Sequence, residues 1–215
     1  MSNVKKISCG MVNCYLISEG DSSILVDTGI SQFKDKVVKL CENTNVRLIV
    51  LTHGHIDHIQ NAAYLSQKLK APIAIHKGDA ELTQNNLLQP LKAKGLLGKL
   101  LLLASVRSFK KDKVEEFTPS IFLKDEDTLK DYGIDARIVG LEGHTKGSIG
   151  LDIKEKYFIC GDALMNMPSP SISRLFHDKA QMLKSAMKIS NLGDRIIYFG
   201  HGGPKKNRSW VIEEE

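Results

Sequence analysis

A chain of 215 residues with 42% hydrophobic content can bury one substantial core, so the sequence predicts a single domain over residues 1–215. Its net charge of +5 is modest and does not by itself indicate a nucleic-acid-binding protein. The four cysteines show no CxxC spacing, Lys5 and Lys6 are followed by no sustained apolar segment, and no run reaches the roughly 18 apolar residues of a membrane span. We therefore expect a cytoplasmic protein with reduced thiols, no signal peptide and no transmembrane segment.

The first 30 residues predict two or three short strands, among them 12–18 and 23–26. The second of these ends in Asp27-Thr28-Gly29. Asp27 has two interpretations on local grounds: a turn-forming residue before Thr-Gly, or a carboxylate that orients a metal-bound histidine. A helix is predicted at 31–43, and it leads into an apolar strand at 46–51.

Residues 52–61, with the sequence THGHIDHIQN, concentrate four metal-ligand side chains into six positions. They are His53, His55, Asp57 and His58. The strand at 46–51 precedes them and an amphipathic helix predicted at 59–69 follows, so the cluster lies on a strand-to-helix turn where side chains converge. Imidazole with carboxylate suits Zn²⁺, Fe²⁺ or Mn²⁺ better than Ca²⁺ or Mg²⁺. Three of the seven histidines fall here, so a chance group of polar residues on an exposed loop is a poor explanation of the pattern.

A strand is predicted at 71–76, and Asp79 and Glu81 are expected to open a short helix. Residues 82–120 then form a Leu-rich segment with seven basic residues against three acidic ones, a local charge of +4. We expect a helical, basic insert here, built as a pair of helices. It can serve as a substrate lid, a homodimer contact or a membrane-surface contact, or simply as a solvated hairpin that covers the sheet.

The second half of the chain repeats the strand-and-turn pattern. Strands are predicted at 121–123, 136–139, 149–153, 156–160 and 195–199, with a helix at 180–189 and a proline-containing loop at 165–173. Three of the strands run into polar turns that contain His144, Asp162 and His201. His76 and His177 lie outside these turns, and we expect packing or surface roles for them.

The motif His53-x-His55-x-Asp57-His58, together with Asp27, His144, Asp162 and His201 in this order, resembles the signature of the metallo-β-lactamase superfamily over nearly the whole chain. The resemblance implies an α/β fold, an αβ/βα four-layer sandwich of two mixed sheets with helices on the outer faces and metals at one rim. It implies that His53, His55 and His144 hold one divalent metal ion. Asp57, His58 and His201 would hold the second, with Asp162 bridging both, and Asp27 would orient a ligand. Two Zn²⁺ ions are expected, with Fe²⁺ or Mn²⁺ as alternatives.

From this ligand set we predict a dinuclear metal-dependent hydrolase in which a metal-bound hydroxide attacks a small carbonyl substrate, a thioester or a lactone or other ester. Asp57 is expected to be catalytic as a proton acceptor or donor. Asp162 at the bridging position resembles glyoxalase II-like thioesterases, lactonases and nucleases more than true β-lactamases. Because only 14 residues follow His201, the helical domain with which glyoxalase II binds glutathione is not expected.

Three alternatives remain open from the sequence. One is a mononuclear iron oxidoreductase similar to persulfide dioxygenases. Another is a nuclease or phosphodiesterase of the same superfamily, although the 82–120 segment lacks the aromatic residues that stack nucleic-acid bases. The third is a metal-stabilised binding module without turnover. The substrate-binding residues are not identified by the sequence.

Overall fold

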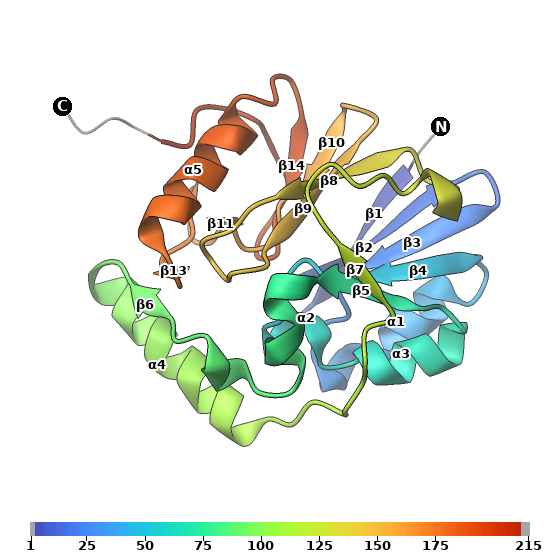
Figure 1. The fold of residues 1–215 in the computed structure, drawn as a ribbon, viewed down its shortest axis with the longest axis horizontal. Coiled ribbons are helices and arrows are strands. Elements are labelled where there is room, and N and C mark those ends of the chain that lie inside the picture. Colours follow the sequence, from blue (N-terminus) through green and yellow to red (C-terminus); the bar gives the residue numbers. More distant parts are fainter. Residues whose placement is uncertain (1–2, 212–215) are drawn as a thin grey trace.

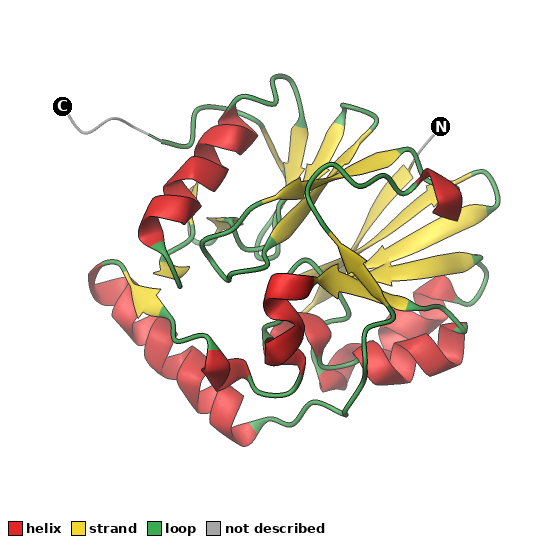
Figure 2. Ribbon diagram, in the orientation of Figure 1, coloured by secondary structure: helices red, strands yellow, loops and turns green. Residues whose placement is uncertain are grey.

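Two β-sheets pack face to face with helices on both outer sides in the computed structural model, which describes residues 3–211 (Figures 1 and 2). This arrangement confirms the expected αβ/βα sandwich. The two sheets follow one another along the chain, because the strands of the first lie within residues 3–123 and those of the second within residues 136–206.

The first sheet has the strand order β1-β2-β3-β4-β5-β7. Its strands are β1 (Asn3–Cys9), β2 (Val12–Glu19), β3 (Ser22–Val26), β4 (Val46–Val50), β5 (Ile73–His76) and β7 (Ile121–Leu123). The first three strands are antiparallel, whereas β3, β4, β5 and β7 run parallel. The crossovers between the parallel strands carry η1 (Ser31–Phe33), α1 (Lys34–Cys41), α2 (Ile56–Ile59) and α3 (Ala62–Leu69).

The second sheet has the order β15-β14-β10-β9-β8 and is covered by α5 (Lys179–Ser190). Its strands are β8 (Ala136–Gly140), β9 (Ile149–Ile153), β10 (Tyr157–Ile159), β14 (Ile196–Tyr198) and β15 (Lys205–Lys206). Because β8 and β10 both run antiparallel to β9, they share one direction, and β14 is parallel to β10. The chain between β7 and β8 contains the short η4 (Lys130–Tyr132).

Alternation of side chains along the strands fixes which face of the first sheet meets which layer. Leu25 and Ile49 belong to the apolar cluster shared with α1 and α3. Their neighbours Ile24 and Leu48 belong to the cluster that lies between the two sheets. All four side chains are fully buried. Strands buried on both faces explain why residues 48–51 are all apolar rather than alternating, and Arg47 is the one exposed residue of β4.

The helix predicted at 59–69 is wrong as a single element, because α2 ends at Ile59 and α3 begins at Ala62. Asn61 lies at the break, and its side-chain amide donates hydrogen bonds to the carbonyls of Thr28, Gly29 and Ile30. The interruption therefore ties the turn that follows β3 to the turn that follows β4.

The loop predicted at 165–173 is also wrong, because the segment forms a hairpin of β11 (Leu164–Asn166) and β12 (Pro170–Ile172). The two prolines are compatible with it, since Pro168 lies in the connecting turn and Pro170 is the first residue of a strand in a two-stranded sheet.

The pair of helices expected within 82–120 is a single long helix, α4 (Gly95–Lys111). The chain before it forms η2 (Lys77–Thr83), η3 (Asn86–Leu88) and the short β6 (Lys92–Ala93), which pairs with β13 (Leu175–Phe176). Pro90 removes a backbone donor and Gly95 has a φ of 70°, so a continuous helix cannot pass through this stretch. In Figure 1, α4 lies along the outer edge of the molecule, apart from the helices that cover the sheets. No helix within residues 3–211 has the length and apolarity needed to cross a bilayer.

Candidate metal centre

The polar turns of both sheets meet at one rim of the sandwich because of strand direction. In the first sheet, parallel β3 and β4 end at Val26 and Val50, so Asp27 and the 53–58 turn emerge at the same edge. In the second sheet, β8, β10 and β14 share a direction and deliver the turns with His144, Asp162 and His201. Carboxyl ends of parallel strands are the usual place for a binding site in such sheets.

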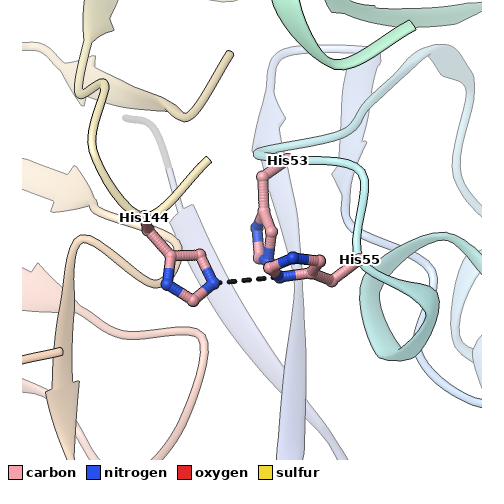
Figure 3. A group of neighbouring side chains, drawn as sticks. All are labelled: His53, His55 and His144. Carbon is pink, nitrogen blue, oxygen red and sulfur yellow. Dashed lines mark hydrogen bonds between the residues drawn. The ribbon is translucent and has the colours of Figure 1, made fainter. Parts of the chain in front are cut away.

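The seven side chains predicted as ligands form three overlapping groups of potential metal-binding atoms. Within each group the ligand atoms lie within 4.8 Å of one another. The groups are His53, His55 and His144; His53, His58 and Asp162; and Asp57, His58 and His201. The first and third are the two sets expected from the sequence, and the second joins them through shared histidines. Figure 3 shows the first group, in which His53 and His55 come from one sheet and His144 from the other.

Asp162 occupies the middle of the cluster. Its Oδ2 atom lies 3.1 Å from Nε2 of His201 and 3.8 Å from Nε2 of His144, while its Oδ1 atom lies 3.5 Å from Nε2 of His58. The carboxylate thus faces histidines of both groups, as a bridging ligand must. Gly200 permits this approach, because a Cβ atom there would lie 2.0 Å from Oδ1 of Asp162.

Four of the histidines are held through Nδ1 with Nε2 left facing the cluster. His58 Nδ1 lies 2.8 Å from Oδ2 of Asp27, and His53 Nδ1 lies 3.1 Å from Oγ1 of Thr52. The backbone carbonyls of Leu175 and Met11 accept from Nδ1 of His144 and His201, each at 2.8 Å. A fixed Nδ1 partner sets both the ring orientation and the tautomer of a metal-binding histidine.

Asp27 therefore has a definite position beside the cluster. Its carboxylate is buried, and it also accepts hydrogen bonds from the backbone amide and hydroxyl of Thr52. Its own φ is 59°, a left-handed conformation that Asp tolerates better than most residues. The contact with His58 is the geometry of an orienting carboxylate rather than of a simple turn residue.

Buried polar atoms without partners mark where ions would fit. Among the described residues, Nε2 of His53 and His58 and Oδ1 of Asp162 are buried at the cluster and have no hydrogen-bond partner. Nε2 of His55 is also buried without a partner, but it is Nδ1 of this residue that faces His144. Leaving such atoms unpaired costs roughly 1–3 kcal/mol each, so native proteins rarely do so in a cluster. Imidazole nitrogens with carboxylates form a donor set for transition metals, and the residues present fit such ions.

The carboxylates and two of the histidines stabilise one another's charged forms. Burial opposes ionisation of Asp57 and Asp162, but the adjacent His58 and His201 keep the pKa of both carboxyls below the usual range. Burial likewise disfavours the charged form of His58, yet the carboxylates of Asp27 and Asp57 raise its pKa to about 9. The pKa of His201 is raised for the same reason, by Asp162 and Asp57.

The other three histidines are neutral, since burial dominates their behaviour. The pKa of His55 is lowered to about 3 by burial and by the nearby His144. Burial also lowers the pKa values of His53 and His144. Neutral imidazole is the form that binds metal, so these three side chains need to lose no proton.

Asp79 is a component of the site that the sequence interpretation assigned only to a helix start. It is fully buried, and its carboxylate accepts hydrogen bonds from the backbone amides of Gly54 and Gly147 and from the hydroxyl of Thr145. Asp79 therefore joins the turn that contains His53 and His55 to the loop that contains His144. Asp79 follows β5, as Asp27 follows β3 and the 53–58 turn follows β4. This place shortly after a strand is the sequence signal that could have revealed it.

A pocket of about 610 Å³ opens beside the cluster. His55, Asp57, His144, Asp162 and His201 lie at one part of its wall, and apolar residues of α4 and of the β11–β12 hairpin line much of the remainder. The lining was not predicted from the sequence, because it is assembled from segments far apart in the chain.

The two histidines expected to lie outside the site do so. His76 caps η2 by accepting from the amide of Gly78, and Nδ1 of His177 lies 3.3 Å from the carbonyl of Pro90. Lys146, which stands in the His144 loop, forms an ion pair with Glu81 at 3.0 Å. Its charge is therefore engaged outside the pocket lining.

Known proteins share this fold and are similar to this chain in sequence. A family model described as the metallo-beta-lactamase superfamily matches residues 7–201. The hydroxyacylglutathione hydrolase of Pelagibacter ubique (strain HTCC1062) is 27% identical over 206 residues, which cover 94% of this chain and 71% of that protein. Among solved structures, the BLEG-1 B3 metallo-beta-lactamase has a TM-score of 0.75 at 23% identity, over 95% of this chain and 94% of that one.

A second solved structure is that of TTHA1623 in a di-iron-bound form. It has a TM-score of 0.69 at 18% identity and covers 97% of this chain and 100% of that one. Both structural matches show a shared fold that extends over nearly the whole chain.

Proposed function

The chain belongs to the metallo-β-lactamase superfamily, and from this premise we propose that it is a hydrolase that uses two metal ions to cleave a small carbonyl substrate. The observation that carries this proposal is the group of orphaned, buried ligand atoms at the rim. Their convergence from two sheets has no structural explanation without an ion, since apolar residues would pack the same space at lower cost.

The division of the ligands follows the groups that the geometry defines. His53, His55 and His144 would hold one ion, while Asp57, His58 and His201 would hold the other. Asp162, which faces histidines of both groups, would be shared. We propose zinc for both positions, because five imidazoles outnumber two carboxylates in the donor set. The di-iron form of TTHA1623 supports iron as the alternative.

Bound ions would supply a water molecule of lowered pKa and a Lewis acid that polarises the substrate carbonyl. The residues of the chain supply the rest. Asp57 is one-third exposed, lines the pocket and remains ionised, so its carboxylate can accept the proton of the attacking water. Asp27 and the carbonyls of Leu175 and Met11 keep the imidazoles in one orientation and one tautomer.

The substrate class that fits best is a thioester or an ester, including a lactone. In thioester hydrolysis the acyl carbon–sulfur bond breaks, the oxygen of water bonds to the acyl carbon, and the thiolate leaves and takes up a proton. The hydroxyacylglutathione hydrolase relative supports a thioester by its name. We propose no membrane-spanning or nucleic-acid function.

Elemental analysis with a hydrolysis assay tests the proposal. Protein purified without chelator should contain about two zinc ions per chain, as expected for a two-metal site, and should hydrolyse acyl thioesters or lactones. His53→Ala should lose metal and activity, whereas His177→Ala, a histidine outside the cluster, should retain both. One iron per chain, with oxygen uptake on a persulfide and no hydrolysis, would overturn the proposal in favour of an oxidoreductase.

A further inference from the structure

The pocket beside the metal centre is polar at one end and apolar along most of its length. Within residues 3–211, the ionisable side chains of its lining are all potential ligands, and no lysine or arginine contributes to it. A volume of about 610 Å³ lies within the usual range of small-molecule sites, roughly 300–1,000 Å³. An uncharged ligand part fits these walls better than an anionic one, which would find no cation there.

One wall of the pocket is a single face of α4. The lining residues are Leu97, Leu101, Ala104, Ser105, Ser108 and Phe109. Their spacing of three and four residues places them on one side of the helix. At the carboxyl end of this face the ring of Phe109 stacks on that of His55, with 5.2 Å between centroids. The apolar wall therefore begins directly at the metal centre and follows the helix away from it.

Much of the remaining lining consists of flexible side chains. Met11, Met165 and Met167 belong to it, the last two from the β11–β12 hairpin, and Leu91 and Leu175 complete it. Methionine adapts its shape to a range of apolar ligands better than branched residues do. Such a wall suits a chain of methylene groups rather than one rigid ring system.

We propose that this pocket binds the linear acyl chain of the substrate, so that the preferred substrates are medium-chain acyl thioesters or esters. The inference rests on the proposed hydrolysis, because the carbonyl would lie at the metal centre and the tail along α4. Burial of each methylene is worth about 0.8 kcal/mol, so each should raise kcat/KM roughly fourfold until the apolar wall is covered.

A chain-length series tests this, with acetyl, butanoyl, hexanoyl, octanoyl and decanoyl thioesters of N-acetylcysteamine. Ala104→Trp places a large ring in the pocket, and Met187→Trp places the same ring on α5, at a position that is 53% exposed and outside the lining. We expect the rise with chain length to stop at shorter chains in Ala104→Trp and to be unchanged in Met187→Trp.

Calorimetric binding of decanamide to metal-free protein separates this inference from the proposed function. Decanamide should bind the wild type with a negative heat-capacity change and at least about tenfold more weakly to Ala104→Trp. Such binding without any hydrolysis would leave the acyl site standing and refute the hydrolase. Hydrolysis with a flat chain-length profile, or decanamide binding equal in both tryptophan variants, would overturn the acyl site alone.

The outer face of α4 carries an independent inference. Leu96, Leu100 and Leu103 are exposed by 77%, 57% and 70%. Lys99, Arg107 and Lys110 are exposed as well and share their side of the helix by the same spacing. Residues 82–111 contain six basic residues and no acidic one. Leucines among cations on one exposed helix face are typical of segments that lie on an anionic lipid surface.

A second copy of the chain fits this face less well, because a symmetric contact would place Lys99, Arg107 and Lys110 of one copy against the same three cations of the other. We therefore infer that the outer face of α4 rests on an anionic bilayer, which would bring the apolar pocket of the same helix next to a source of acyl chains.

Vesicle sedimentation tests the inference with full-length protein. Vesicles of phosphatidylcholine with phosphatidylglycerol should bind it at low salt and less at high salt, whereas phosphatidylcholine alone should not. A triple variant, Leu96→Ser with Leu100→Ser and Leu103→Ser, should lose binding, and Met187→Ser, an exposed apolar residue of α5, should retain it. A salt-independent dimer that the triple variant abolishes, without vesicle binding by the wild type, would overturn the lipid surface in favour of a second copy.

Discussion

The Nδ1 atom of His55 lies 3.0 Å from the Nε2 atom of His144, although the two residues come from different sheets (Figure 3). His144 is already held at Nδ1 by the carbonyl of Leu175, so its Nδ1 carries the proton and its Nε2 accepts. His55 must then donate from Nδ1. This hydrogen bond joins the turns of the two sheets at the rim, and an ion held by both nitrogens would have to replace it.

This relationship predicts a change of tautomer on metal binding. In long-range nitrogen–proton NMR spectra of metal-free protein, His55 and His144 should both be neutral and both carry the proton on Nδ1. Addition of zinc should shift the proton of His55 from Nδ1 to Nε2 and leave the Nδ1 proton of His144 in place. His177, outside the cluster, serves as the internal control. An unchanged His55 in zinc-loaded protein would exclude its Nδ1 as a ligand.

Asp57→Asn should reduce kcat by about 10²–10⁴-fold, the range for general acid–base groups, because an amide cannot take up the proton of the attacking water. Folding stability should change little, since the side chain is one-third exposed at the pocket wall. Steady-state kinetics and thermal unfolding measure the two effects, with the exposed Asp178→Asn as a control. Near-normal turnover with both metals retained would remove Asp57 from the mechanism.

Asp79→Ala should weaken metal binding by about 10–100-fold, as loss of a partner behind the ligands does elsewhere. The substitution removes the acceptor shared by Gly54, Thr145 and Gly147, so the two ligand loops lose their common anchor. Competition with a chelator measures the affinity, and Asp21→Ala provides a matched control at an exposed carboxylate. If only the unfolding temperature falls while metal affinity stays constant, Asp79 supports the fold rather than the site.

Metal uptake should release protons in a pH-dependent manner. The pKa of His58 is about 9 and that of His201 is also raised, so both side chains are charged near neutral pH and must lose their protons to bind metal. The charged form of His58 stabilises the fold fully below the ordinary histidine pKa, and that contribution disappears as the pH rises through about 9. The raised pKa of His201 acts in the same direction. Metal affinity should follow the opposite course and increase over the same interval.

Titration of weakly buffered protein with zinc measures this release. About two protons per loaded chain are expected from the histidines near neutral pH, and fewer above about pH 9. His201→Ala should release about one proton fewer than the wild type. Proton release that is constant across this interval would contradict the assigned charge states.

Much of the sandwich could be predicted because its strands are marked locally. The apolar run at 46–51 and the alternation elsewhere identify strands buried on two faces or on one. The breaks that the sequence did not predict depend on distant partners. The helical pattern is interrupted at Asn61 because its side chain donates a hydrogen bond to the Thr28 carbonyl, in the turn that follows β3. The 165–173 segment forms a hairpin whose residues line the pocket.

The types and order of the candidate ligands were determined by the sequence alone, because histidines and carboxylates gathered in turns after strands have few other uses. Only the tertiary structure decided which nitrogen of each histidine faces the cluster, since that depends on partners such as Leu175 and Met11 from remote segments. It also decided the role of Asp79 and the shape of the pocket under α4. These hydrogen bonds and this cavity form between segments that are far apart in the sequence, so they exist only once the two sheets have packed against each other.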